Sequence, residues 1–260
     1  MKWFIFCNNE LLLQHNSDGT YTIPSSDNPP VALQPWNSIH TIGDYSTAEI
    51  DGIGIAPADT QFLPLRKTFF LLSETDYRLA GKCAELIYWD KNTRFCGVCG
   101  GTMKKHTAIS KRCQHCGKEV WPQLAIAVIV RITRHNLDTG EEEILLVRAR
   151  NFKRNHYGLV AGFVETGETL EQALCREVLE ETGITITNIH YFASQPWPFP
   201  SGLMVGFTAE YHTGNLQLQE EELVAGDWFT KTNLPPIPDQ ASIARALIDD
   251  WIGNSYLHDK

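Results

Sequence analysis

The 260-residue sequence has no long hydrophobic run, no internal repeat and no low-complexity tract. No stretch approaches the roughly 18 apolar residues of a transmembrane helix, so the sequence predicts no membrane span. The apolar stretch at residues 3–7 is interrupted by Asn8, Asn9 and Glu10 and is too short for the hydrophobic region of a secretory signal. We therefore expect a cytoplasmic protein with no membrane partner.

An overall excess of basic residues is also missing, because the net charge is −9. Residues 95–122 form a small basic island with five basic side chains and one acidic side chain, whereas residues 123–260 carry ten and nineteen. This charge balance argues against a nucleic-acid-binding face over the whole surface, since such a face would have to neutralise many phosphates. If the acidic side chains of residues 123–260 converge, they favour binding of divalent cations.

The cysteines do not have the pattern of a disulfide framework. They number seven, and Cys7, Cys83 and Cys175 are scattered. The other four form two C-x2-C pairs separated by thirteen residues, which predicts a tetrahedral, structural zinc site with no open coordination position. These zinc ligands are Cys96, Cys99, Cys113 and Cys116.

Two other interpretations of this cysteine block stay open. One is a redox pair or a set of buried thiols. The other is a zinc ribbon that binds nucleic acid or protein through its basic side chains. Those side chains are Lys104, Lys105, Lys111 and Arg112.

Hydrophobic patterning predicts strands separated by helices, as in an α/β or α+β fold. We expect strands at residues 124–132, 144–147, 185–194 and 203–211, and helices at residues 79–89, 170–182 and 243–252. The patterns predict three parts: an α/β domain at residues 1–93, a zinc ribbon at 94–122 and a second domain of strands and helices at 123–260.

The helix predicted at residues 170–182 has unusual carboxylates. Thr169 and Gln172 match a capping box, and Gly183 stands where a helix-ending glycine is expected. At about 100° per residue, Glu177 and Glu181 fall within the apolar stripe of this helix, and Glu180 borders it. Because unpaired buried charge is very costly, this placement predicts binding of one or two cations such as Mg²⁺ or Mn²⁺.

The segment GFVETGETLEQALCREVLEETGI at residues 162–184 matches every position of the Nudix box. The chain therefore resembles the Nudix hydrolases, which implies an α/β/α sandwich with a mixed sheet and metal-assisted cleavage of a pyrophosphate bridge. The resemblance implies that Glu177, Glu180 and Glu181 bind Mg²⁺ or Mn²⁺ and that Glu181 activates water. Arg176 is expected to orient Glu168 or a neighbouring glutamate.

The proline-rich segment Ser194-Gln195-Pro196-Trp197-Pro198-Phe199-Pro200 narrows the resemblance. Its prolines hold Trp197 and Phe199 in an extended segment, where their rings could stack on a flat base, although a partner-binding motif or a core edge is an equal alternative. With the box and the four cysteines, the segment resembles the NADH pyrophosphatase (NudC-type) subfamily. That resemblance implies a degenerate Nudix-like domain at the N-terminus.

The subfamily resemblance implies further site residues. Ala161, through its carbonyl, and Glu222 are expected to be additional metal ligands. The expected substrate-binding residues are Arg66, Trp121, Gln195, Pro196, Trp197, Pro198, Phe199, Pro200, Ser201, Gly202 and Ala244. The chain departs from the subfamily pattern at Gly202, Ser25 and Ala108, which affects the expected substrate preference.

The implied reaction is hydrolysis of NADH or NAD⁺ to nicotinamide mononucleotide and AMP, with removal of NAD caps from RNA as a second activity, by a homodimer. Two alternatives stay open. One is a broader hydrolase that prefers ADP-ribose, FAD or dinucleoside polyphosphates. The other is a zinc-ribbon binding module with an inert Nudix domain.

Overall fold

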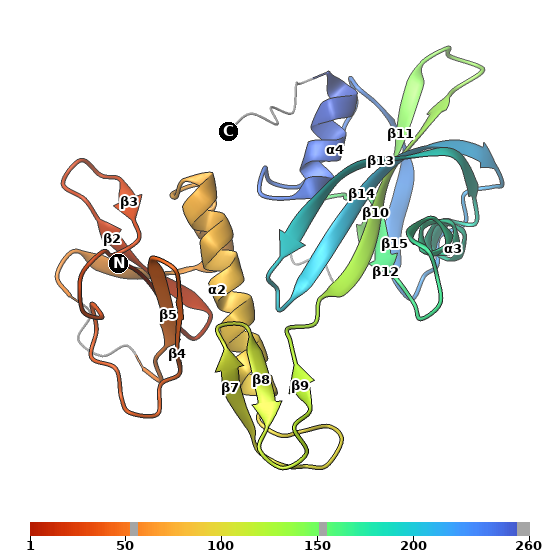
Figure 1. The fold of residues 1–260 in the computed structure, drawn as a ribbon. Helices are drawn as coiled ribbons and strands as arrows, with labels where there is room; N and C mark the ends of the chain where they lie inside the picture. The colour runs from red at the N-terminus through yellow and green to blue at the C-terminus, as the bar shows by residue number, and fades with distance from the viewer. Residues whose placement is uncertain (53–56, 151–154, 254–260) are drawn as a thin grey trace. The chain divides into compact units, whose positions relative to one another are not determined.

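The computed structural model describes residues 1–52, 57–150 and 155–253 (Figure 1). The chain forms two compact units. The first unit comprises Met1–Leu124 and Trp197–Ser201, and the second comprises Ala125–Pro196 and Gly202–Lys260. The division at residues 93 and 122 stays a prediction, because the backbone contacts group the cysteine block with the N-terminal sheet.

The first unit is built on a six-stranded mixed sheet. The strands are β1 (Lys2–Cys7), β2 (Glu10–His15), β3 (Tyr21–Thr22), β4 (Ile39–Ile42), β5 (Tyr45–Glu49) and β6 (Thr60–Pro64). Their order is β3-β2-β1-β5-β4, with β6 also paired to β2. The central pair β1 and β5 is parallel, and the other pairings are antiparallel.

Two helices follow this sheet, α1 (Leu65–Thr68) and α2 (Glu74–Asn92). Side chains of β1 point alternately to the two faces. Phe4 and Phe6 pack with Ala80, Cys83 and Ile87 of α2. On the opposite face, Trp3 and Ile5 of β1 pack with Val31 and Leu33 of the loop after β3. One helix and one loop therefore cover the two faces of this sheet.

The cysteine block folds into a three-stranded antiparallel sheet, β7 (Met103–Thr107), β8 (Ser110–Cys113) and β9 (Glu119–Val120). We call residues 94–122 the ribbon. Its small core contains Met103 together with Cys96 and Cys113. So little apolar surface is buried here that a bound metal would have to supply much of the local stability.

The second unit contains the other six-stranded mixed sheet. Its strands are β10 (Ala125–His135), β11 (Glu142–Ala149), β12 (Val160–Phe163), β13 (Thr185–Trp197), β14 (Gly202–Thr213) and β15 (Leu223–Thr230). The order is β13-β14-β10-β11-β15, and β12 pairs with β10. Strand β10 is parallel to β14 and antiparallel to β11 and β12.

Helices α3 (Leu170–Thr182) and α4 (Ile243–Ile252) cover opposite faces of this sheet (Figure 1). Val128, Val130 and Ile132 of β10 point toward α3, whereas the intervening Ile129 packs against α4. Because both faces are covered, β10 and β11 are continuous apolar runs, as buried strands require. The predicted α/β/α sandwich is confirmed.

The predicted elements are present, with small differences at their ends. The helix expected at residues 79–89 is longer and begins at Glu74, where Ser73 accepts a hydrogen bond from the Asp76 amide. The strand expected at residues 185–194 continues to Trp197. No helix in the described ranges has both the length and the apolar character needed to cross a bilayer.

Candidate functional site

Helix α3 begins and ends at the residues that its local sequence specifies. The Thr169 side chain accepts from the Gln172 amide, and the Gln172 side chain accepts from the Thr169 amide at 2.9 Å. Gly183 takes the left-handed conformation, with φ of 70°, and its amide donates to the Leu179 carbonyl. These caps determine which carboxylates lie on the same face of the helix.

Arg176 holds the acidic side chains of this helix in place. Its Nε and Nη2 donate to the two carboxylate oxygens of Glu168 at 2.6 and 2.9 Å. Its Nη1 donates to Glu177 at 2.8 Å and to Glu180 at 3.1 Å, and Nη2 also donates to the Phe163 carbonyl. All five N–H groups of the guanidinium are therefore used.

Glu168 is the loop carboxylate to which Arg176 was predicted to reach, and this prediction is confirmed. The Arg176 guanidinium and the Glu165 amide donate to the Glu168 carboxylate and lower its pKa to about 2. Glu168 is therefore ionised at neutral pH. It forms a fixed anchor between the loop and the helix rather than a group that exchanges protons.

Glu177 lies directly over Gly162 of β12. A β-carbon built on Gly162 would come within 1.9 Å of the Glu177 side-chain carboxyl carbon, so only glycine leaves room for this carboxylate. Burial raises the pKa of Glu177, an effect that its ion pair with Arg176 opposes and the charges of Glu180 and Glu222 reinforce. The glycine of the Nudix box therefore leaves the space that the Glu177 carboxylate occupies.

Glu181 is the most buried acid of the site, with 5% of its surface exposed. Burial raises its pKa to about 8, and the nearby charges of Glu177, Glu222 and Glu180 add to the effect. Within the described ranges, no basic side chain forms an ion pair with it. The sequence placed Glu181 inside the apolar stripe, and its burial confirms that placement.

The charges of Glu177, Glu180 and Glu222 act on Glu181, so these four glutamates are the candidates for binding a hard divalent cation. Carboxylate oxygens are the ligands that Mg²⁺ and Mn²⁺ prefer, and a cation would relieve the mutual repulsion that raises the Glu181 pKa. Glu180 and Glu222 are the more exposed members, and Ala161 lies beside Gly162 on β12. The carboxylate oxygens are spaced more widely than the cysteine sulfurs, which form the only ligand group within 4.8 Å in the described ranges.

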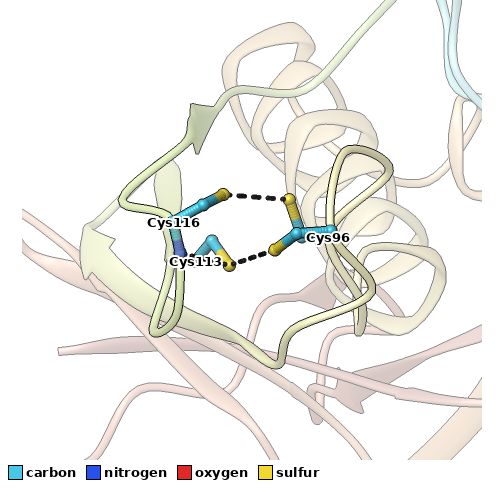
Figure 2. A group of neighbouring side chains, drawn as sticks. Cys96, Cys113 and Cys116 are labelled. Carbon is cyan, nitrogen blue, oxygen red and sulfur yellow. Dashed lines mark hydrogen bonds between the residues drawn. The ribbon is translucent and has the colours of Figure 1, made fainter.

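The four cysteine sulfurs face one another across the ribbon (Figure 2). Cys96 and Cys116 sulfurs lie 3.7 Å apart, and Cys99 and Cys113 sulfurs lie 3.5 Å apart. A tetrahedral zinc ion with Zn–S bonds of about 2.3 Å needs sulfur separations of about 3.8 Å. The geometry therefore fits such an ion.

The pKa values of these cysteines differ with their hydrogen bonds. The Cys116 and His115 amides donate to Cys113 and lower its pKa to about 6. The Gly101 amide lowers the pKa of Cys99 in the same way. Hydrogen bonds with the Cys116 and Cys113 sulfurs outweigh this effect, and the pKa of Cys99 rises to about 12. Neighbouring thiolates therefore repel one another, and a bound divalent metal would relieve this repulsion.

The segment from Trp197 to Ser201 packs within the first unit. The Arg66 guanidinium lies 5.3 Å from the centre of the Trp197 ring, and Phe199 meets the same ring edge-to-face at 5.2 Å. Pro198 packs so closely on Gly81 that a β-carbon there would lie 3.1 Å from it. The structure thus places Arg66 beside Trp197 and Phe199, a contact between the N-terminal part and the proline-rich segment that the sequence did not predict.

A second group of predicted residues lies at the ribbon. Trp121 and Ser201 both line a pocket of about 350 Å³, and the Ser201 hydroxyl donates to the Gln123 carbonyl at 3.1 Å. Gly202 is buried and pairs with Ala125 at the start of β14. The departure at position 202 therefore lies at the start of a strand in the sheet of the second unit.

Gln195 contacts the N-terminal end of α4. Its Nε2 donates to the Ala241 carbonyl at 3.1 Å, and its Oε1 accepts from the Ile243 amide at 2.7 Å. Both ends of the amide are therefore used within the fold. Gln195 can influence a substrate by positioning α4, which carries Ala244 in its first turn.

Phe163 is a candidate site residue that the sequence did not single out. It follows Gly162 on β12, the residue is 65% exposed, and its carbonyl accepts from Arg176. Exposed aromatic rings beside a catalytic cluster offer a stacking face to a flat base. The available signal was a large apolar residue inside the GFVE stretch, at the end of a short strand.

The other departures from the subfamily pattern lie at the surface of the first unit. Ser25 is exposed and donates to the Met1 carbonyl, and Ala108 lies in the turn between β7 and β8. Ser25 and Ala108 therefore belong to the first unit, whereas the glutamates of the carboxylate cluster belong to the second.

Comparisons with known proteins agree with this geometry. The NUDIX domain family matches residues 123–251, and the NADH pyrophosphatase-like rudimentary NUDIX domain matches residues 1–89. A crystal structure of a NUDIX hydrolase from Nitrosomonas europaea has the same fold, with a TM-score of 0.50 and 22% identity over 64% of this chain and 93% of that one.

Two relatives show how far the likeness extends along the chain. The NAD-capped RNA hydrolase NudC of Deinococcus radiodurans is 36% identical over 95% of this chain and 86% of its own length. The protein of the same name from Salmonella heidelberg is 41% identical over 68% of this chain and 66% of its own length. The chain therefore belongs to the NudC-type, NADH pyrophosphatase-like subfamily of the Nudix hydrolases.

Proposed function

We propose that this chain hydrolyses the pyrophosphate bond of NADH and NAD⁺ to nicotinamide mononucleotide and AMP, and removes NAD caps from RNA by the same reaction. The observation that carries the proposal is the cluster of Glu177, Glu180 and Glu181 on α3, with the most buried of the three close to other negative charges. The names of the relatives supply the substrate class.

Glu177, Glu180, Glu181 and Glu222, with the Ala161 carbonyl, are the residues that would hold Mg²⁺ or Mn²⁺. When bound, such a cation neutralises the negative charge of the pyrophosphate and favours ionisation of the attacking water. Cys96, Cys99, Cys113 and Cys116 would hold a structural zinc ion.

In the proposed reaction, water attacks one phosphorus, the bridging oxygen leaves with the other phosphate, and the proton of the water passes to a carboxylate. We assign that proton to Glu181, the most buried acid of the cluster and the glutamate that the Nudix-box resemblance implies as the activator of water. Arg176 does not touch the substrate in this scheme, since all of its N–H groups hold protein oxygens. It keeps Glu168, Glu177 and Glu180 in place.

Substrate recognition is assigned to the exposed aromatic rings. Phe163 lies next to Gly162, while Trp121 and Ser201 line the pocket at the ribbon. Homodimer formation stays a prediction, as do the roles of Arg66, Gln195 and Ala244.

The proposal is tested with purified chain and a panel of NADH, NAD⁺, NAD-capped RNA, ADP-ribose, FAD and a dinucleoside polyphosphate. We expect the highest kcat/KM on an NAD-containing substrate, with nicotinamide mononucleotide and AMP as products. Higher kcat/KM on ADP-ribose, FAD or the dinucleoside polyphosphate would support the broader hydrolase instead.

Glu181→Gln tests the catalytic assignment. Removing a proton-accepting carboxylate is expected to lower kcat by about 10²-fold or more at saturating Mg²⁺ or Mn²⁺. Glu171→Gln is the matched control, because Glu171 is an exposed acid in the first turn of the same helix. Near-normal turnover of Glu181→Gln would show that the metal and proton roles lie elsewhere.

A further inference from the structure

Lys111 of β8 is a buried cation that the proposed reaction does not use. Its side chain is 7% exposed. Its Nζ lies 2.7 Å from the Asp90 carboxylate, and it donates to the Asp90 and Thr93 carbonyls at 2.7 and 2.9 Å. Three N–H donors thus meet three oxygens, so the ammonium group is fully satisfied.

These oxygens belong to the C-terminal end of α2. The last carbonyls of a helix have no partner within it, and a cation there is favoured by the helix dipole. The Lys111 ammonium also lies 5.5 Å from the centre of the Trp89 ring. One ribbon side chain therefore caps the helix and contacts its last aromatic residue.

The Asp90 carboxylate makes this contact an ion pair at a buried position. Although burial favours the neutral acid, the His40, Lys111 and Ser38 side chains hold the pKa of Asp90 well below its usual range. The fully buried His40 lies 3.8 Å from the second Asp90 oxygen. Loss of Lys111 alone would leave the half-buried Asp90 carboxylate without its nearest cation.

Lys105 is used in a similar way, because its Nζ donates to the Ile39 carbonyl of β4 at 2.6 Å. Arg112 pairs with Glu119 at 3.0 Å within the ribbon. Much of the basic island is thus engaged by protein oxygens. Lys105 and Lys111 attach the ribbon to the N-terminal sheet and helix of the same unit.

The pocket that Trp121 and Ser201 line lies at this junction. Tyr88, Trp89 and Thr93 of the α2 end form one side, and Cys96, Met103 and Trp121 of the ribbon form another. Lys111 contacts two of these lining residues directly, through the Trp89 ring and the Thr93 carbonyl. Cys96 is at the same time one of the four clustered cysteines.

We propose that Lys111 is a positioning residue that fixes the end of α2 against the ribbon and thereby sets the shape of the pocket bordered by Trp121 and Ser201. The inference rests on the proposed function, in which that pocket receives part of the dinucleotide.

The first test compares Lys111→Met with Lys118→Met in zinc-loaded protein. Lys118 is an exposed lysine of the same ribbon, so its substitution makes the same change in charge. For Lys111→Met we expect KM for NADH to rise about five-fold or more while kcat stays within about two-fold, because only binding geometry is lost. Lys118→Met is expected to keep both constants.

The double variant Asp90→Asn/Lys111→Met separates positioning from folding. It removes both charges of the buried pair and leaves no uncompensated ion, so it is expected to fold even if Lys111→Met does not. Its KM should stay raised. Hydrogen exchange of the amides at residues 88–93 should be faster in both variants than in Lys118→Met.

An unchanged KM in the double variant, or a loss confined to kcat, would overturn the positioning role. Unchanged exchange at residues 88–93 would do the same, independently of any substrate. If the unmodified chain hydrolyses no NADH, the proposed function fails, and the exchange measurement still decides whether Lys111 holds the end of α2.

Discussion

At the scale of single residues, the site depends on one glycine as much as on its acids. Gly162 has no side chain, and the Glu177 carboxylate occupies the space where a β-carbon would be. Arg176 holds the other side of that carboxylate at 2.8 Å. Glu177 is thus confined between a backbone surface and a guanidinium, which preorganises it for its proposed role.

Gly162→Ala is therefore expected to displace Glu177 and lower kcat about 10-fold or more, because small misplacements of catalytic groups are costly. Steady-state kinetics and Mg²⁺ titration would measure the change. Gly52→Ala is the control, since a β-carbon at Gly52 meets no atom within 4 Å. Equal activity of the two variants would show that the position of Glu177 is unimportant.

Glu181 predicts a pH dependence of stability. Its pKa is raised from 4.5 to about 8 in the folded chain, so folding favours the protonated acid. Its contribution to stability is complete below pH 4.5 and is lost as the pH rises through 8. Without added Mg²⁺ or Mn²⁺, Glu181→Gln should therefore be more stable than the original chain at pH 8.5, by about 1–3 kcal/mol.

Urea unfolding of both proteins at pH 4.5 and pH 8.5 checks this prediction. The difference between them should be largest at pH 8.5 and should shrink at pH 4.5, where the acid is protonated in the folded chain and about half protonated in the unfolded chain. A difference that grows on acidification would contradict the raised pKa.

At the scale of elements, α3 and α4 differ in what determines their position. Helix α3 begins and ends through its own neighbours, Thr169, Gln172 and Gly183. Helix α4 has a local cap, since Ser242 accepts from the Arg245 amide, but it is also held by Gln195, 48 residues away. Gln195, which the sequence predicted as a substrate-binding residue, therefore makes hydrogen bonds that hold α4 in the fold.

Gln195→Met keeps the size of the side chain and removes both hydrogen bonds to α4. We expect the free energy of unfolding to fall by about 1–3 kcal/mol, because the Ile243 amide and the Ala241 carbonyl lose their partner. Urea denaturation would measure it, with Ser194→Ala as the control at the exposed neighbouring position. If stability is unchanged but KM rises, Gln195 contacts the substrate directly.

At the scale of the whole molecule, each unit has its own hydrophobic core, and the ribbon of the first unit has very little of one. Metal binding is the physical means by which so small a sheet can be stable. The buried Lys111–Asp90 pair then joins that metal-dependent part to α2.

Metal analysis is expected to find one zinc ion per chain, lost in Cys113→Ser and kept in Cys175→Ser, which changes an exposed cysteine outside the cluster. Loss of the ion should lower the melting temperature by about 5 °C or more, because the ribbon then unfolds. Equal zinc content in the two variants would rule out the four-cysteine site.

Much of the candidate site could be predicted from sequence because its signals are local. A capping box and a glycine fix the ends of α3, and glutamates spaced four residues apart then share one face whatever the rest of the chain does. The two C-x2-C pairs are equally local, since each turn brings its own two sulfurs together.

The tertiary structure decided everything that joins residues far apart in the chain. Three features depend on how strands and helices pack: the burial of Glu181, the space that Gly162 leaves for Glu177, and the contact of Lys111 with α2. Short-range spacing in the sequence carries no information about that packing. The segment Trp197–Ser201 follows a strand of the second unit yet packs within the first. Sequence could identify the chemical groups at these positions, but only the packing of the chain determines which of them meet.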